Sequence, residues 1–105
     1  MSKFKLYVLD GCPFCKRALD RIKSLGLDHE SIIISHEQKE KYKIKHEMET
    51  FPQIFFIDNT NKNKTEYKIG GCDELETLLD IVKTIGEKYN IKIVEKIINI
   101  IKNKE

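Results

Sequence analysis

Residues 4–25 read FKLYVLDGCPFCKRALDRIKSL, with two cysteines between an apolar run and a segment of helical spacing. Its apolar run at 4–9 predicts a strand that is buried on most of both faces. Asp10-Gly11 ends that run, and from Pro13 onward the apolar residues recur at helical spacing, as Ala18, Leu19, Ile22 and Leu25. Gly26 then supplies the C-terminal cap of a helix. We therefore expect a strand, a tight turn that carries two cysteines, and a helix.

The remainder of the chain predicts further strands and helices in alternation. Strands are expected at 31–34, 53–57 and 65–69, with a polar hairpin turn at 58–63, and helices at 35–48 and from Cys72 or Asp73 to 85. Ser35 and Gln38 match a capping box at the start of the first of these helices. The second has an apolar stripe formed by Leu75, Leu78, Leu79, Val82 and Ile85.

The C-terminal residues 90–103 predict an amphipathic helix. Their isoleucines and Val94 fall on one half of a helical wheel, while Lys92, Glu95, Lys96, Asn99 and Lys102 fill the other half. The expected order is β-α-β-α-β-β-α plus this helix, which is an α/β fold. We expect a single domain over residues 1–105, with a core at 3–86 on which the helix at 90–103 packs. Its sheet has four strands and is mixed, because the first two strands are parallel and the hairpin is antiparallel.

Composition excludes several classes of function. The 105 residues carry 19 basic and 17 acidic side chains, and this near balance argues against a nucleic-acid binder. No signal peptide opens the sequence, and no apolar stretch is long enough to span a membrane. We expect a cytoplasmic monomer, whose three cysteines in a reducing compartment do not form a secreted disulfide framework.

Cys12-Pro13-Phe14-Cys15 is the segment that carries chemistry. Cys12 is expected at the start of a helix, where free backbone N–H groups and the positive end of the dipole favour a thiolate. Pro13 suits the first helical position, where its missing N–H costs nothing. Cys15 lies one turn further in and is more shielded, as befits a resolving thiol. We expect the two cysteines to form a redox-active disulfide.

Zinc is the alternative ligand for such a pair. A structural zinc site usually needs four ligands, often in two pairs, and this chain has only one pair. The remaining candidates stand alone in the sequence: Cys72, His29, His36 and His46. We therefore expect no metal.

Two further segments are candidates for binding. Thr50-Phe51-Pro52 precedes the third strand, and a cis bond before Pro52 would turn the Phe51 backbone toward an extended thiol substrate. Gly70-Gly71-Cys72-Asp73 precedes the last predicted helix. Its glycines allow close backbone approach, Asp73 is expected to cap the helix, and the helix end can bind a carboxylate. Taken singly, each segment is also an ordinary turn.

Together the three segments resemble a dithiol glutaredoxin of the Cys-Pro-Phe-Cys type, a member of the thioredoxin superfamily. The matching residues are Cys12-Pro13-Phe14-Cys15, ETFPQIF at 49–55 and IGGCDEL at 69–75, and the resemblance covers about residues 3–86. It implies a thioredoxin-like fold and an enzyme that uses glutathione to reduce protein disulfides and protein–glutathione mixed disulfides. Glutathione would be the reductant, and ribonucleotide reductase is among the partners that the family commonly reduces.

The resemblance also assigns roles to single residues. Cys12 would be the nucleophile and Cys15 or a second glutathione the resolving thiol. Glutathione would lie along Phe14, Thr50, Phe51, Pro52, Gly71, Cys72 and Asp73.

Two departures from the family pattern concern basic residues. Leu9 and Glu49 occupy positions where many members have Lys or Arg, so we expect weaker glutathione affinity unless Gln38, Lys39 or Lys41 compensates. These departures leave one alternative, a glutaredoxin-like thioredoxin reduced by thioredoxin reductase. A glutathione-ligated [2Fe–2S] carrier is a second alternative, although such proteins mostly have Cys-Gly-Phe-Ser.

Overall fold

The structure is a computed structural model, and it describes residues 2–59 and 64–84. Its elements, in chain order, are β1 (Lys3–Leu9), α1 (Pro13–Ser24), β2 (His29–Ile34), the 3-10 turn η1 (His36–Gln38), α2 (Lys39–His46), β3 (Gln53–Asp58), β4 (Thr65–Gly70) and α3 (Cys72–Thr84). The predicted order of strands and helices is confirmed in this part of the chain. The helix predicted at 90–103 lies outside the described residues. Among the described helices, none is long and apolar enough to cross a membrane.

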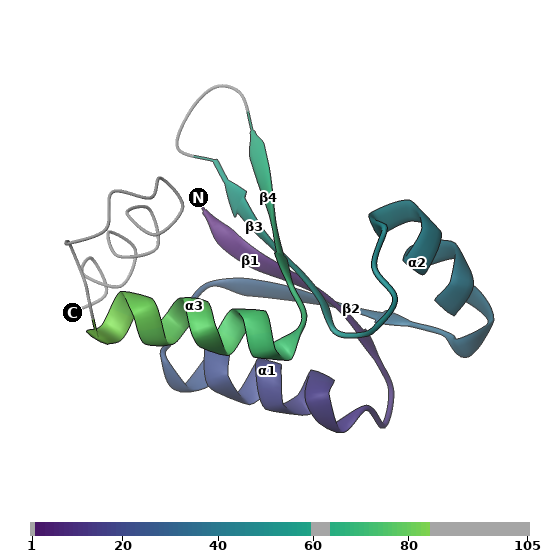
Figure 1. Cartoon of the computed structure of the whole chain (residues 1–105), viewed down its shortest axis with the longest axis horizontal. Helices are drawn as coiled ribbons and strands as arrows, with labels where there is room; N and C mark the ends of the chain where they lie inside the picture. The colour runs from purple at the N-terminus through teal and green to yellow at the C-terminus, as the bar shows by residue number, and fades with distance from the viewer. Residues whose placement is uncertain (1, 60–63, 85–105) are drawn as a thin grey trace.

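The four strands form one mixed sheet in the order β2-β1-β3-β4 (Figure 1). β1 and β2 are parallel, and their register pairs Phe4 with His29 and Leu9 with Ile34. β3 runs antiparallel to both β1 and β4. The predicted parallel start and antiparallel hairpin are therefore confirmed.

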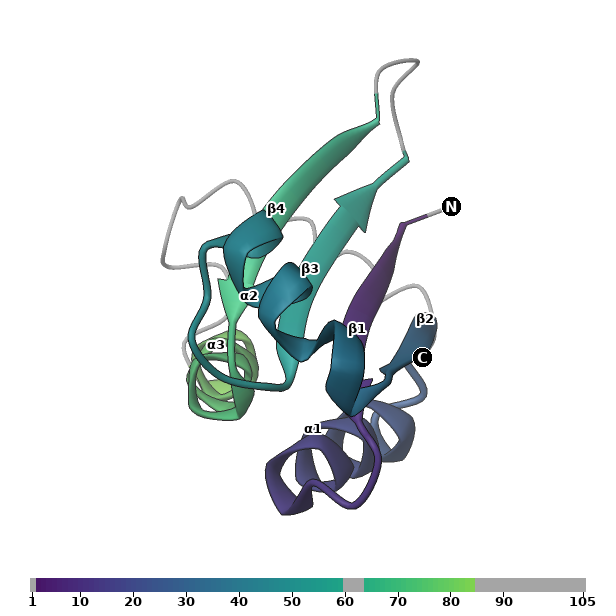
Figure 2. The ribbon, with the colours of Figure 1, turned by 90° about the vertical axis from the view of Figure 1, so that its right-hand side faces the viewer.

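Helices cover both faces of the sheet, with α1 and α3 on one side and α2 on the other (Figure 2). Alternate residues of a strand point to opposite faces. On the α2 face, the Tyr7 ring lies 5.4 Å from the Tyr42 ring and 4.5 Å from the His46 ring. The opposite face carries the core, where Phe4 and Phe56 are almost fully buried with ring centroids 5.2 Å apart.

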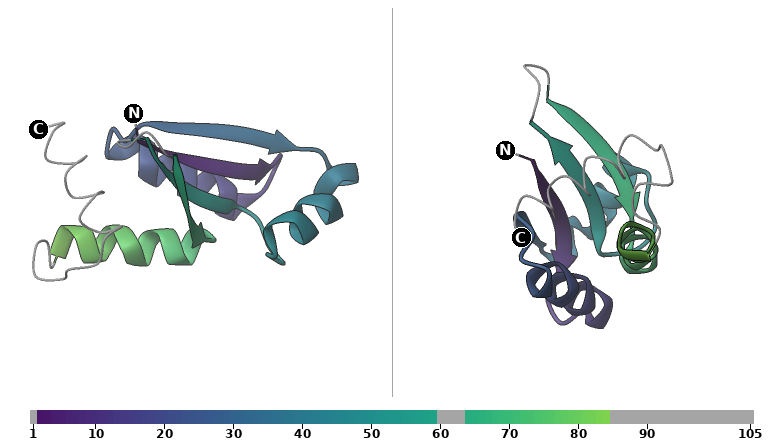
Figure 3. Two further views of the ribbon diagram at one scale, coloured as in Figure 1. Left: turned by 90° about the horizontal axis from the view of Figure 1, so that it is seen from above. Right: turned by 90° about the vertical axis from the view of Figure 1, so that its left-hand side faces the viewer.

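Two ion pairs show that α1 and α3 run side by side in the same direction. Arg17 pairs with Glu76 at 2.6 Å, and Arg21 pairs with Asp80 at 2.7 Å. Moving four residues forward along α1 therefore also moves four residues forward along α3. Both helices consequently begin at the same edge of the sheet (Figure 3). Three junctions meet at that edge: β1 to α1, α2 to β3, and β4 to α3.

The predicted capping box at Ser35 is wrong. Its hydroxyl would have to accept the backbone N–H of Gln38, but that N–H donates to the Ser35 carbonyl at 3.0 Å and closes the turn η1. The Ser35 side chain makes no capping hydrogen bond, and α2 begins only at Lys39. The helix is thus shorter than the predicted 35–48: it ends at His46, and the capping residue Glu47 that follows has a left-handed backbone with φ of 53°.

Candidate active site

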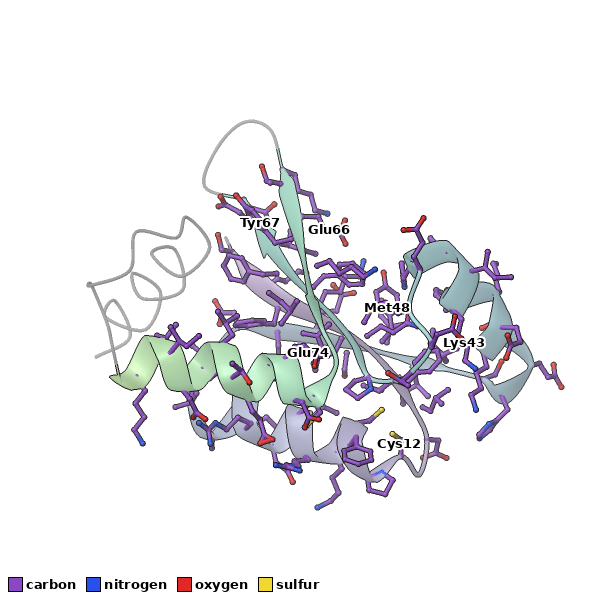
Figure 4. All side chains as sticks on the ribbon, in the orientation of Figure 1. Cys12, Lys43, Met48, Glu66, Tyr67 and Glu74 are labelled. Atoms are coloured by element: carbon purple, nitrogen blue, oxygen red, sulfur yellow. The ribbon has the colours of Figure 1, made fainter. Side chains whose placement is uncertain are left out.

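Cys12 is the residue that caps α1, and it lies at the edge where the three junctions meet. Figure 4 labels one residue near each junction: Cys12, Met48 and Glu74. The Cys12 Sγ accepts the backbone N–H of Cys15 at 3.3 Å, and Pro13 begins the helix as predicted. The Cys12 sulfur therefore faces a backbone N–H donor and the positive end of the α1 dipole. The side chain is also partly exposed, so that a substrate sulfur can reach it.

Cys15 lies one helical turn further on, and its thiol is held under different conditions. It is buried, with 2% of its surface exposed, and its Sγ accepts the Leu9 backbone N–H at 3.5 Å. Burial, followed by the neighbouring Cys12, raises the pKa of Cys15 to about 12. The predicted shielding of Cys15 is therefore confirmed, and both cysteines are free thiols in this structure.

The segment before β3 brings a backbone carbonyl to Cys12. The Phe51–Pro52 peptide bond is cis, and the Phe51 carbonyl oxygen accepts from the Cys12 Sγ at 3.9 Å. Phe51 and Pro52 are buried, whereas Thr50 is exposed. This loop consequently places main-chain polar groups beside the Cys12 sulfur, where an extended peptide could pair with them.

The start of α3 lies against the same loop. A Cβ built on Gly71 would lie 3.7 Å from the Pro52 carbonyl oxygen. Glu74 caps this helix, since its carboxylate accepts the Gly71 backbone N–H at 2.7 Å. The expectation that Asp73 caps the helix is wrong, because α3 already begins at Cys72 and Asp73 falls inside the first turn. The exposed Asp73 carboxylate remains beside the helix start.

Cys72 is buried, with 4% of its surface exposed, and its thiol donates to the Glu76 carboxylate at 3.8 Å. Burial, followed by the charge of Glu76, raises the pKa of Cys72. Arg17 binds the same carboxylate through two nitrogens, at 2.6 and 3.2 Å. Burial and the Glu76 charge together outweigh the opposing effect of Arg17 on this pKa, so Cys72 stays a thiol and is a poor nucleophile.

The structure places the predicted site residues on the three junctions. Cys12 and Phe51 are in direct contact, and Phe14 projects from α1 with 55% of its surface exposed. Gln38, Lys39 and Lys41 lie at the start of α2 and, in the described chain, make no hydrogen bond to these junctions.

Sequence reasoning missed the roles of Glu74, Glu76 and Arg17. Glu74 stands three residues after Gly71, the spacing of a capping glutamate, so its role had a local signal. The contact of Arg17 with Glu76 had none, because it depends on how α1 packs beside α3. Within residues 2–59 and 64–84, no three His, Cys, Asp or Glu side chains gather as a metal site.

Comparisons with known proteins agree with this geometry. The family model described as Glutaredoxin matches residues 4–60. A probable glutaredoxin from Synechocystis sp. is 31% identical over 80 residues, which cover 73% of this chain and 82% of that protein. Glutaredoxin 1 from Rickettsia bellii is 33% identical over 79 residues, which cover 70% of this chain and 72% of that protein.

Solved structures show the same fold. Glutaredoxin 1 from Francisella tularensis superposes with a TM-score of 0.63 at 26% identity, covering 79% of this chain and 98% of that one. The glutaredoxin from Brucella melitensis gives a TM-score of 0.56 at 27% identity, over 83% and 92% of the two chains. The fold is therefore thioredoxin-like, as predicted. With the Cys12–Cys15 pair at the start of α1, the chain belongs to the glutaredoxin family of glutathione-dependent thiol-disulfide oxidoreductases.

Proposed function

We propose that the protein is a dithiol glutaredoxin in which Cys12 is the nucleophile and Cys15 the resolving thiol. The observation that carries this proposal is the difference between the two sulfurs. Cys12 is accessible and accepts an N–H bond at the start of α1, whereas the Cys15 thiol is buried and its pKa is raised to about 12. Of the two sulfurs, the one that a substrate disulfide can reach is therefore that of Cys12.

With a glutathionylated protein, the Cys12 thiolate attacks the glutathione sulfur of the mixed disulfide. A Cys12–glutathione disulfide forms and the protein thiolate leaves. A second glutathione thiolate then attacks that disulfide, which frees Cys12 and releases oxidised glutathione.

With a protein disulfide, Cys12 forms a mixed disulfide with the protein, and Cys15 displaces the protein thiolate to give the Cys12–Cys15 disulfide. Two glutathione molecules restore the dithiol.

Glutathione would lie across the three junctions. The cysteine of the tripeptide would pair with the Phe51 backbone beside Pro52, and Phe14 would flank it. Its γ-glutamyl carboxylate would meet free N–H groups at the start of α3, because the first N–H groups of a helix have no partner within the helix. Asp73 would face the γ-glutamyl ammonium group. In support, the Gly71 N–H donates to the Glu74 carboxylate, so the N–H groups offered to a ligand are those of the first residues of α3, from Cys72 onward.

The test is turnover of a glutathione mixed disulfide and of a protein disulfide by wild type, Cys12→Ser and Cys15→Ser, with Cys72→Ser as the matched control. Cys12→Ser should lose both activities. Cys15→Ser should keep the first and lose the second, while Cys72→Ser keeps both. Activity that persists in Cys12→Ser, or turnover that requires thioredoxin reductase in place of glutathione, would contradict the proposal.

A further inference from the structure

A buried amide side chain lies behind the loop that faces Cys12. Gln53, the first residue of β3, has none of its surface exposed. Its Oε1 lies 2.7 Å from His46 Nδ1, and its Nε2 donates to the Met48 carbonyl at 3.3 Å. Both the amide oxygen and the amide nitrogen are therefore bound to the segment that leads from α2 into the loop.

The His46 ring is itself fixed in place. Its centroid lies 4.5 Å from the Tyr7 ring of β1 and 4.8 Å from the Phe55 ring of β3. The His46 ring is therefore packed against aromatic side chains from two strands of the sheet. The Gln53 oxygen accepts a hydrogen bond only, which assigns the proton to His46 Nδ1. His46 thus connects the last turn of α2 to β3 by both packing and a hydrogen bond.

Lys68 on β4 holds the same segment from the other side. Its Nζ donates to the carbonyl of His46 at 2.7 Å and to that of Glu47 at 3.1 Å. These two carbonyls lie at the end of α2. They accept no hydrogen bond within the helix, and the negative end of the helix dipole attracts a cation there. The three side chains Lys68, His46 and Gln53 therefore hold one stretch of backbone, residues 46–48.

We propose that Lys68, His46 and Gln53 form a clasp that positions the Phe51 carbonyl against Cys12. The segment from Glu47, whose backbone is left-handed, to Pro52 is short, and it is held by the clasp at one end and by β3 at the other. A shift at residues 46–48 therefore moves Phe51, whose oxygen lies 3.9 Å from the Cys12 sulfur. All three are positioning residues, because none of them touches the reacting sulfur. Their effect on turnover rests on the proposed use of the Phe51 backbone in binding glutathione.

Lys68→Met is the primary variant, because Lys68 is exposed and its loss leaves the core intact. Lys68→Arg serves as the conservative rescue, since it keeps a charged donor. Lys64→Met is the matched control: it removes an exposed lysine just before β4 that makes no hydrogen bond to residues 46–53 in the described chain. His46→Phe is a second variant, which keeps the ring packing and loses the bond to Gln53.

Two measurements are made on each variant. The first is the KM and kcat for a glutathione mixed disulfide. Lys68→Met and His46→Phe should raise KM by about fivefold with little change in kcat, because they misplace a binding group rather than the nucleophile. The second is the rate at which iodoacetamide alkylates Cys12 at pH 7 without glutathione, followed by peptide mass spectrometry. The Phe51 carbonyl oxygen lies 3.9 Å from the Cys12 sulfur and covers part of it, so releasing that carbonyl should uncover the sulfur and speed alkylation.

The alkylation rate decides the clasp independently of the glutathione site. Faster alkylation in Lys68→Met and His46→Phe, with wild-type rates in Lys68→Arg and Lys64→Met, supports the clasp even if wild type does not saturate with the glutathione substrate. If wild type does not saturate with the glutathione substrate, that result counts against the proposed function and not against the clasp. Unchanged alkylation in both variants, or an equal change in Lys64→Met, would overturn the clasp.

Discussion

Cys12 and Cys15 stand three residues apart at the start of one helix, but their sulfurs react at different stages of the proposed cycle. The Cys15 sulfur is buried, and its pKa is raised to about 12, mainly by that burial. A thiol in this state does not compete for oxidants at neutral pH. It becomes useful only when a disulfide has formed at the neighbouring Cys12, since attack within the protein has a high effective concentration.

The raised pKa of Cys15 predicts a loss of stability in alkali. Its ordinary value is 9.0, and the folded value is about 12. Between these two pH values the unfolded chain has released the proton and the folded chain has kept it, so the free energy of unfolding falls as pH rises. Urea unfolding of the reduced protein from pH 8 to pH 10 should therefore show a steeper decline in wild type than in Cys15→Ala. Equal slopes in the two proteins would show that Cys15 ionises normally in the fold.

At the scale of single elements, the junction of β4 and α3 depends on a glycine. Gly70 has φ of +126°, and a Cβ there would lie 2.8 Å from the Glu74 side chain that caps α3. Gly70→Ala should lower the free energy of unfolding by about 2–3 kcal/mol through strain and the displaced cap. Gly26→Ala is the matched control, because Gly26 also has positive φ, +65°, but open space around it.

The control substitution should cost only about 1 kcal/mol, which is the backbone penalty alone. Both values are measured by urea unfolding at neutral pH. If Gly26→Ala destabilises the protein as much as Gly70→Ala, the contact with Glu74 contributes nothing.

The elements themselves could be predicted because each has its own local signal. Apolar runs and periodicity identified the four strands, α1 and α3, and Pro13 and Gly26 marked the two ends of α1. The helix α2 was predicted from a start signal at Ser35 rather than from an apolar stripe. Boundaries failed where a backbone hydrogen bond competed with a side chain. At Ser35 the turn η1 took the N–H that the predicted cap required, and no residue pattern decides between those two acceptors.

Across the whole molecule, stability and chemistry depend on different aromatic residues. Phe56 has none of its surface exposed and contacts the Phe4 ring, whereas Phe14 is 55% exposed beside Cys12. Phe56→Ala should lower the free energy of unfolding by about 3–5 kcal/mol. Phe14→Ala should change it by less than about 0.5 kcal/mol.

Enzyme turnover should also distinguish the exposed Phe14 from the buried Phe56. Phe14→Ala should raise the KM for a glutathione mixed disulfide by about threefold, which corresponds to the loss of one exposed contact. Urea unfolding and steady-state kinetics on both variants measure these effects. A KM for Phe14→Ala equal to that of wild type would remove this side chain from the proposed glutathione site.

The site as a whole could be predicted only in part. Cys12, the Phe51–Pro52 segment and the glycines at 70–71 stand close together because their three junctions share one edge of the sheet, and motif spacing indicates those junctions. The side chains that support them come from elsewhere in the chain. Lys68 and Glu76 reach their partners through strand pairing and helix packing, which the linear sequence does not encode as a pattern.

The parallel course of α1 and α3 has a consequence for molecules approaching from solution. Both helices direct their amino-terminal ends to the edge that holds Cys12, so peptide groups contribute an attraction for anions at that edge. Peptide groups have no proton to gain or lose between acid and alkali. Their pull on an anionic thiol compound should therefore persist over a wide range of pH, and added salt should weaken it by screening.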